Sequence, residues 1–215
     1  MKRPPTAAET EQGAFWRGAF GDAYSERNAS TAERVTMRER MWRRVLAAVM
    51  DAPPASVLEV GANVGVNLQA LARLLPGAAL SALEPNATAR ATLAGSGVVP
   101  PERIHDAFGD AIPLPDRAVE MAFTCGVLIH VAPDRLLDTY RELYRVASRW
   151  LVTIEYFSDR AEEVLYRGHA GKLFKRDFGA VWLDHFPGVE LVDYGFFWKP
   201  ATGLDNLTWW LFRKP

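Results

Sequence analysis

The chain has 215 residues, a formal net charge of −1 and a hydrophobic fraction of 49%. This length suffices for one large domain with its own core, and the near-neutral charge argues against a nucleic-acid-binding protein. No apolar run is long enough to cross a bilayer and no signal-peptide pattern is present, so we expect a cytoplasmic protein that does not act at a membrane. Cys125 is the only cysteine, which excludes an internal disulfide.

The first part of the chain, residues 1–50, is predicted to be a helical lid. Residues 14–30 are rich in aromatic side chains but are interrupted by two glycines, so we expect short helical pieces. Residues 30–50 have the periodicity of an amphipathic helix, with Ser30 or Thr31 as its N-cap.

From residue 56 onward, short apolar runs alternate with helix patterns. The predicted elements are a strand at 56–60, a helix at 65–75, a strand at 79–84, a helix at 86–96, a weak strand at 103–109, a strand at 119–126, a helix at 132–148 and a strand at 149–157. This alternation is typical of a parallel sheet that is covered by helices on both faces.

The end of the chain has a different pattern. Residues 189–199 and 207–214 read as strands joined by a short, turn-rich link, so we expect an antiparallel hairpin at or within the sheet. Residues 158–186 are long enough for an insertion and a helix on the substrate side. No linker divides the chain, and we expect a single domain over residues 1–215.

The sequence VLEVGANVG, at 57–65, joins the first strand to its helix. In an open parallel sheet, ligands bind at this turn, beyond the carboxyl ends of the strands. Gly61 permits a tight turn, and Gly65 lets the helix begin close to the strand. A dinucleotide site needs G-x-G-x-x-G, and its second and third glycine positions are occupied here by Asn63 and Val66. The sequence therefore disfavours a nicotinamide oxidoreductase.

The acid before this turn points to another ligand. A carboxylate at Glu59 would repel a pyrophosphate but suits a cationic ligand, and S-adenosylmethionine carries both an ammonium and a sulfonium group. Glu84 ends the second strand, where a carboxylate can accept both hydroxyls of a ribose. Asp110 follows the third strand and can accept a hydrogen bond from an adenine amino group, with Asp106 as the competing candidate.

These segments, in the order VLEVGANVGVNL, ALEPN, GDAIPLP and FTCGVLIHV, resemble class I S-adenosylmethionine-dependent methyltransferases. A narrower resemblance, carried by EQGAFWRGAFGDAYSERN, GVLIHVAPDRL and YRGHAGKLFKRDF, is to the pseudaminic acid biosynthesis-associated methylases. The resemblance implies an α/β, Rossmann-like fold. Its seven-stranded, mostly parallel sheet has an antiparallel C-terminal hairpin and helices on both faces. S-adenosylmethionine is the implied cofactor and S-adenosylhomocysteine the implied product.

The same resemblance implies further cofactor contacts. Tyr24 and Arg27 would close over the methionine end, with the arginine on its carboxylate. Pro85 and Ala111 would lie beside the nucleoside, and Cys125 would lie at the end of the fourth strand near the cofactor. The resemblance also makes an asparagine at position 63 a normal feature of this turn.

Candidate catalytic groups follow the fourth and fifth strands. His130 lies in a loop that is near the reacting centre in similar enzymes, and a purely structural histidine is the alternative. Glu155 ends the fifth strand, where an acid can bind an amine or take a proton, unless it is solvated or paired with an arginine. Its neighbour Tyr156 is a candidate for substrate contact.

A basic stretch suggests what the substrate carries. Arg167, His169 and Lys172 lie in a short, glycine-containing insertion and suit an anionic acceptor, unless this is only a solvated loop. Trp16 of the predicted lid is a further candidate for substrate contact, with plain packing as the alternative. No group of side chains has the spacing of a metal site.

We therefore expect O- or N-methylation of a small, polar, anionic or amino- or sugar-acid metabolite in a biosynthetic pathway, by a monomer or homodimer. The alternatives are a protein or peptide methyltransferase and a non-catalytic nucleotide-binding protein of the same fold.

Overall fold

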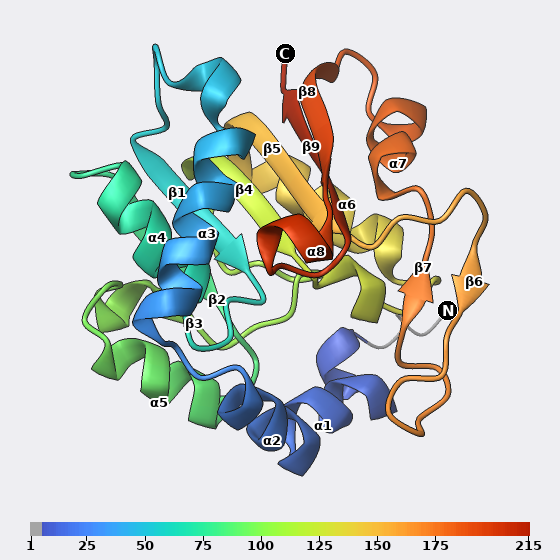
Figure 1. The fold of residues 1–215 in the computed structure, drawn as a ribbon. Helices are drawn as coiled ribbons and strands as arrows, with labels where there is room; N and C mark the ends of the chain where they lie inside the picture. Colours follow the sequence, from blue (N-terminus) through green and yellow to red (C-terminus); the bar gives the residue numbers. More distant parts are fainter. Residues whose placement is uncertain (1–5) are drawn as a thin grey trace.

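The structure, a computed structural model, describes residues 6–215 and is built on a seven-stranded sheet (Figure 1). The strand order is β3-β2-β1-β4-β5-β9-β8. The bounds are β1 Ser56–Val60, β2 Ala79–Leu83, β3 Ile104–His105, β4 Val119–Cys125, β5 Ala147–Glu155, β8 Glu190–Phe197 and β9 Leu207–Arg213. The five neighbouring strands β3, β2, β1, β4 and β5 are parallel to one another. β9 is antiparallel to both of its neighbours, β5 and β8. This topology confirms the predicted Rossmann-like fold with its antiparallel C-terminal hairpin.

Helices cover both faces of this sheet. Their bounds are α3 Ala32–Val45, α4 Val66–Leu74, α5 Ala87–Gly95, α6 Leu136–Val146, α7 Phe178–His185 and the short α8 Lys199–Thr202. One hydrophobic core contains side chains of α3, α4 and α5, and a second contains side chains of α6 and α7. β1 contributes to both because its residues alternate: Val57 belongs to the first core and Leu58 to the second. Glu59 follows in this alternation and therefore points to the α3–α4 face.

The N-terminal segment forms short helices, as the sequence predicts. They are η1 Ala7–Glu9, α1 Glu11–Arg17 and α2 Ala19–Arg27, with Gly18 between the last two. Figure 1 shows α1 and α2 beyond the carboxyl ends of the parallel strands. The side chain of Thr31 caps α3 by accepting from the N–H of Arg34, so Thr31 rather than Ser30 is the N-cap.

Two predicted elements are shorter than expected. β3 spans only Ile104–His105 instead of 103–109. α6 begins at Leu136 rather than at 132, because the residues just before it form a turn. Arg135 is the N-cap of α6, and its side chain makes no capping hydrogen bond. The insertion contains a two-stranded antiparallel pair, β6 Glu162–Glu163 with β7 Phe174–Lys175.

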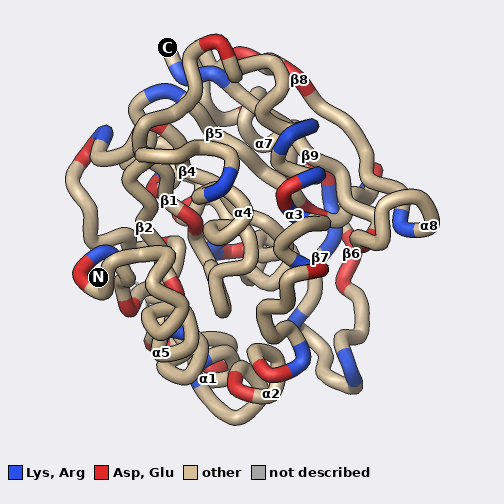
Figure 2. The backbone as a smooth tube through the Cα atoms, turned by 60° about the vertical axis from the view of Figure 1, so that its left-hand side comes forward, with Lys and Arg blue, Asp and Glu red and all other residues tan. Residues whose placement is uncertain are grey.

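The surface of the chain mixes both signs of charge. In the view of Figure 2, segments with Lys or Arg are interspersed with segments that carry Asp or Glu. Within residues 6–215, no helix combines the length and apolar character that crossing a membrane requires.

Candidate functional site

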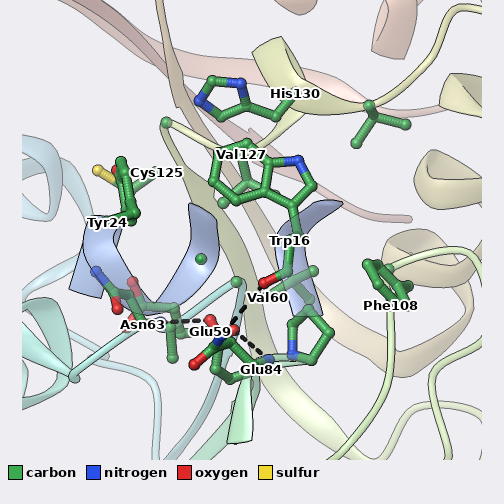
Figure 3. Close-up of a pocket in the computed structure, with 18 of the residues that line it drawn as sticks. Trp16, Tyr24, Glu59, Val60, Asn63, Glu84, Phe108, Cys125, Val127 and His130 are labelled. Atoms are coloured by element: carbon green, nitrogen blue, oxygen red, sulfur yellow. Dashed lines mark hydrogen bonds between the residues drawn. The ribbon is translucent and has the colours of Figure 1, made fainter. Parts of the chain in front are cut away.

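A cavity of about 640 Å³ lies where the carboxyl ends of β1, β2 and β4 meet the N-terminal helices (Figure 3). The predicted site residues on its wall are Trp16, Tyr24, Glu59, Gly61, Asn63, Glu84, Pro85, Asp110, Cys125 and His130. The predicted site residues that do not line it are Arg27, Gly65, Ala111, Glu155, Tyr156, Arg167, His169 and Lys172. Figure 3 shows His130 toward one end of the cavity and Glu84 toward the other.

The turn after β1 has a left-handed backbone at Gly61, Asn63 and Gly65, with φ values of 76°, 47° and 79°. A Cβ at Gly61 would lie 2.5 Å from Cγ2 of Val127, and one at Gly65 would lie 2.3 Å from Cδ1 of Leu93. Both glycines are therefore needed for close packing as well as for backbone freedom. Asn63 tolerates this conformation, and its Oδ1 accepts a hydrogen bond from the hydroxyl of Ser25 at 2.7 Å.

Glu59 is buried, with 1% of its surface exposed, yet only half of its carboxylate is used. Nδ2 of Asn67 donates to Oε1 at 2.6 Å, whereas Oε2 is buried with no hydrogen-bond partner in residues 6–215. Burial raises the pKa of Glu59 to about 8. An unpartnered buried oxygen on a cavity wall favours a ligand that brings a donor or a positive charge.

Arg38 is one of the cavity-lining residues that our reading of the sequence missed. Its guanidinium donates to two sulfur atoms, Sδ of Met41 at 3.3 Å and Sγ of Cys125 at 3.4 Å. No carboxylate of residues 6–215 lies within 4.0 Å of it. The sequence holds a signal for this position, because Arg38 lies three residues after Val35 and three before Met41, on the apolar face of α3.

Arg27, which was expected to reach the methionine carboxylate, lies elsewhere. Its side chain is exposed, and the guanidinium carbon lies 5.6 Å from the centre of the Phe20 ring. Within residues 6–72, the cationic side chains that line the cavity are Arg34 and Arg38 of α3, not Arg27 of α2. Arg34 already donates to the carbonyl oxygen of Arg27 at 3.1 Å.

Glu84 accepts two backbone hydrogen bonds at the end of β2. The N–H of Asn63 donates to Oε2 at 2.7 Å, and the N–H of Asn86 donates to Oε1 at 2.8 Å (Figure 3). These bonds fix the plane of the carboxylate, and each oxygen keeps a lone pair for a further donor. Burial raises the pKa of Glu84, an effect that the two backbone donors oppose.

Asn86 connects this part of the site to the N-terminal helices. Its Oδ1 caps α5 by accepting from the N–H of Ala89 at 2.8 Å. Its Nδ2 donates to Oδ1 of Asp22 at 2.9 Å and lies 3.3 and 3.4 Å from the carbonyl oxygens of Trp16 and Arg17. One side chain thus joins the start of α5 to both α1 and α2.

Asp110, rather than its competitor Asp106, lies on the cavity wall. Oδ2 of Asp110 accepts from the N–H of Ala7 at 2.7 Å, and Oδ1 is buried without a partner in the described chain. Asp106 is exposed and pairs with Arg17 at 2.8 Å and with Arg90 at 2.9 Å. Ala111 is exposed and off the wall, and Phe108 is the apolar residue that lines the cavity beside Asp110.

His130 ends the one-turn helix η4, Leu128–His130. Its Nδ1 lies 2.7 Å from the carbonyl oxygen of Lys172, which only accepts hydrogen bonds, so Nδ1 carries the hydrogen and Nε2 holds the lone pair. Burial lowers the pKa of His130 to about 4, so the imidazole is neutral at pH 7. The ring packs 4.6 Å from that of Trp16, whose indole N–H is buried without an acceptor in the described chain.

Glu155 lies behind η4 rather than at the mouth of the cavity. Its carboxylate is fully buried, and Oε1 accepts the backbone N–H groups of Val127 at 3.1 Å and Leu128 at 3.0 Å. Burial raises the pKa of Glu155 to about 7. We expected an acid that is open to substrate. The structure instead places the Glu155 carboxylate in the interior, where it accepts hydrogen bonds from backbone donors.

The remaining predicted residues of the cavity and its edge have weakly acidic side chains. Burial raises the pKa of Tyr24 to about 12 and that of the Cys125 thiol to about 11, so both stay protonated at neutral pH. Tyr156 lies off the wall and donates from its hydroxyl to Oδ2 of Asp205 at 3.0 Å. Burial and the charge of Asp205 raise the pKa of Tyr156.

The basic insertion packs on the outside of the N-terminal helices. The ammonium of Lys172 lies 5.0 Å from the centre of the Phe15 ring and 3.4 Å from Oε1 of Glu11. Arg167 and His169 are exposed, and the His169 ring packs 5.0 Å from that of Phe15. None of the three side chains lines the cavity: Arg167 is exposed, whereas His169 and Lys172 contact Phe15 of α1.

Solved structures of methyltransferases share this fold. A S-adenosylmethionine-dependent methyltransferase from Leishmania major has 16% identity and a TM-score of 0.72, over 96% of this chain and 84% of that one. The 1,6-didemethyltoxoflavin-N1-methyltransferase of Burkholderia thailandensis, with S-adenosylhomocysteine bound, has 18% identity and a TM-score of 0.69, over 99% and 93%. Magnesium protoporphyrin IX methyltransferase from Synechocystis, with S-adenosylmethionine bound, has 13% identity and a TM-score of 0.66, over 98% and 100%.

No protein-family model matches the sequence, and no curated protein matches it. At the identities of the three solved structures, the likeness establishes a shared fold.

Proposed function

We propose that this chain is an S-adenosylmethionine-dependent methyltransferase that modifies a hydroxyl or amino group of a small molecule. The observation that carries the proposal is an acidic and a basic side chain on one cavity wall whose hydrogen-bonding capacity is only partly used. Among residues 6–215, Oε2 of Glu59 is a buried acceptor without a donor, and the guanidinium of Arg38 donates only to sulfur atoms. An α-amino acid offers an ammonium to the first and a carboxylate to the second, and this zwitterion is the methionine end of the cofactor.

The nucleoside end fits the rest of the wall. Glu84 keeps a lone pair on each oxygen for the two hydroxyls of a ribose. Oδ1 of Asp110 is a buried acceptor for an adenine amino group, and the ring of Phe108 lies on the same wall. The fold shared with methyltransferases that hold this cofactor or its product supports the same assignment.

A nicotinamide dinucleotide fits this wall less well. Its pyrophosphate would meet the carboxylates of Glu59 and Glu84 near the turn after β1, where Asn63 takes the place of a glycine. The side chain of Asn63 is also held against α2 by Ser25.

When bound, S-adenosylmethionine supplies a methyl group on a positively charged sulfur, already activated for transfer. His130 then serves as the base: its Nε2 lone pair accepts the proton that an acceptor O–H or N–H loses as the methyl bond forms. The indole N–H of Trp16, buried beside the imidazole, donates a hydrogen bond that orients the acceptor atom. Glu155 is a positioning residue, since it holds the backbone of the segment that carries His130.

The class of acceptor is inferred from what lines the cavity. Arg167, His169 and Lys172 are the reason to expect an anionic acceptor, and their positions away from the cavity wall remove the direct support for it. The resemblance to pseudaminic acid-associated methylases therefore stays a prediction about substrate. We infer a small-molecule acceptor that binds through its reactive hydroxyl or amine.

Calorimetric titration tests the proposal. We expect S-adenosylhomocysteine to bind and NAD not to bind. Arg38→Gln and Glu59→Gln should each weaken S-adenosylhomocysteine binding by roughly tenfold or more, because each removes a charged hydrogen bond. Both variants should bind 5′-methylthioadenosine as the wild type does, because this compound lacks the amino-acid group.

The matched control is Arg40→Gln, since Arg40 is exposed on the same helix. It should bind S-adenosylhomocysteine normally. NAD binding, or equal losses for S-adenosylhomocysteine and 5′-methylthioadenosine in the two cavity variants, would overturn the proposal.

A further inference from the structure

A second groove, of about 910 Å³, lies on the face of β8 and β9 beside the end of β5. Tyr194, Phe196 and Trp210 form its floor, and Phe157 lies on its wall. Tyr194 and Phe196 are 62% and 58% exposed, which is unusual for large rings on a monomer surface. The proposed reaction uses none of these four side chains.

The floor rings gather because of strand register. Tyr194 is the cross-strand partner of Trp210, and Phe196 lies two residues further along β8, so all three point to the same face of the sheet. The ring of Phe157 lies 6.4 Å from that of Trp210. Trp210 is itself only 8% exposed, so Tyr194 and Phe196 supply most of the accessible ring surface of this floor.

Most polar side chains at the rim are already engaged with one another. Asp205 accepts from the hydroxyl of Tyr156 and from Nζ of Lys199, each at 3.0 Å. Asp177 caps α7 by accepting from the N–H of Ala180, and Nζ of Lys175 lies 3.8 Å from Glu162. Within residues 6–215, the rings of Tyr194 and Phe196 are the main part of the groove left accessible to a ligand, which favours a planar, apolar ring over an ion.

The groove adjoins the first cavity. Asp205 lines both, with Leu204 and Arg38 on its cavity side and Tyr156 and Lys199 on its groove side. Figure 1 shows α8, which precedes Asp205, at the edge of the sheet where β5 ends. A molecule that lies across Asp205 therefore reaches both the reaction cavity and the aromatic floor.

We propose that this groove binds the distal ring of the methyl acceptor, and that the acceptor is an extended molecule with a planar aromatic body and a reactive hydroxyl or amine at one end. The inference rests on the proposed function for the identity of the first cavity. It adds a binding site and a substrate class that the cavity alone does not define.

The test compares phenol with 4-phenylphenol, which carries a second ring, by calorimetric titration in the presence of saturating S-adenosylhomocysteine. We expect the wild type to bind 4-phenylphenol roughly tenfold or more tightly than phenol. The double variant Tyr194→Ser, Phe196→Ser should lose this advantage and keep its affinity for S-adenosylhomocysteine. Leu191→Ser is the matched control, because Leu191 is 42% exposed on the same strand and does not line the groove.

An equal preference for 4-phenylphenol in the wild type and in the double variant would overturn the inference. Sedimentation of the same proteins provides a second readout. A wild-type dimer that the double variant converts to a monomer would assign the aromatic floor to a second copy of the chain, and the acceptor site would be rejected. If the wild type does not bind S-adenosylhomocysteine, the proposed function is refuted instead. In that case, titration of 4-phenylphenol without S-adenosylhomocysteine still tests the groove.

Discussion

Glu155 holds the backbone of the segment that carries His130. Its Oε1 accepts the N–H groups of Val127 and Leu128 at 3.1 and 3.0 Å, and Oε2 lies 3.5 Å from the N–H of Ile129. A carboxylate at the end of β5 therefore satisfies the free amides at the start of η4, which follows the neighbouring strand β4. At the other end of η4, the imidazole of His130 is held by a hydrogen bond to the carbonyl oxygen of Lys172.

Removing the Glu155 carboxylate should lower the rate without weakening cofactor binding. We expect Glu155→Ala to reduce kcat about tenfold or more, because η4 loses its anchor, while the affinity for S-adenosylhomocysteine stays within about twofold. Glu155→Gln should recover most of the rate, since the amide oxygen still accepts from the backbone. A glutamine variant as inactive as the alanine variant would show that the charge itself is needed.

His130 should act as a base over the whole neutral range. Burial holds its pKa near 4, so the imidazole is neutral above about pH 5 and the rate should fall only when the pH drops toward 4. His130→Phe should keep the ring packing on Trp16 and lower kcat by about 10² to 10⁴, the usual range for general-base catalysis. The check is a pH–rate profile with a hydroxyl or amine acceptor, and a profile that falls near pH 6.5 would contradict the neutral, buried imidazole.

Cofactor binding should release a proton from Glu59. In the free protein its pKa is about 8, so the carboxyl is largely protonated at pH 7, whereas an ammonium ligand favours the ionised form. The affinity for S-adenosylhomocysteine should therefore rise between about pH 5 and pH 8, by up to tenfold per pH unit. Calorimetry at pH 7 in two buffers of different ionisation enthalpy measures the proton, and Glu59→Gln should abolish its release.

The same shift predicts the pH dependence of stability without ligand. The folded pKa of Glu59 lies above the ordinary glutamate value of 4.5, so between these two values the native state holds a proton that the unfolded chain has lost. The free energy of unfolding should therefore fall as the pH rises from about 4.5 to 8, and Glu59→Gln should flatten this part of the curve. Denaturant titrations across that range provide the comparison.

Mutation distinguishes between Asp110 and Asp106, the two candidate adenine contacts. Asp110→Ala removes a buried acceptor from the cavity wall and should weaken S-adenosylhomocysteine binding by roughly tenfold. Asp106→Ala breaks two surface ion pairs, which contribute little to stability, and should leave the affinity unchanged. The reverse result in calorimetry would assign the adenine to Asp106.

Much of the fold follows from local pattern. Short apolar runs that alternate with helix periodicity specify a parallel sheet, and the turn-rich link between the last two strands specifies the hairpin. The cavity-wall position of Glu59, Glu84 and Asp110 was predictable for the same reason, since each lies at or just after the carboxyl end of a predicted strand.

Contacts between distant segments were not predictable in this way. Arg38 shares the apolar face of α3 with Val35 and Met41, but the sequence does not show that the cavity lies opposite this position. Glu155 looks like an open acid in the sequence, but its partners come from the loop after another strand. Lys172 lies in a basic stretch that resembles a substrate loop, yet its ammonium lies against Phe15.

The side chain of Asn86 connects the wall of the cavity at the end of β2 to the N-terminal segment. It caps α5 next to Glu84 and, at the same time, holds α1 and α2 against the cavity. Displacing α1 and α2 from the cavity would break these hydrogen bonds and the one between Ser25 and Asn63. Under the proposed function, we therefore expect substitutions in residues 6–28 to change how fast the cofactor enters and leaves the cavity.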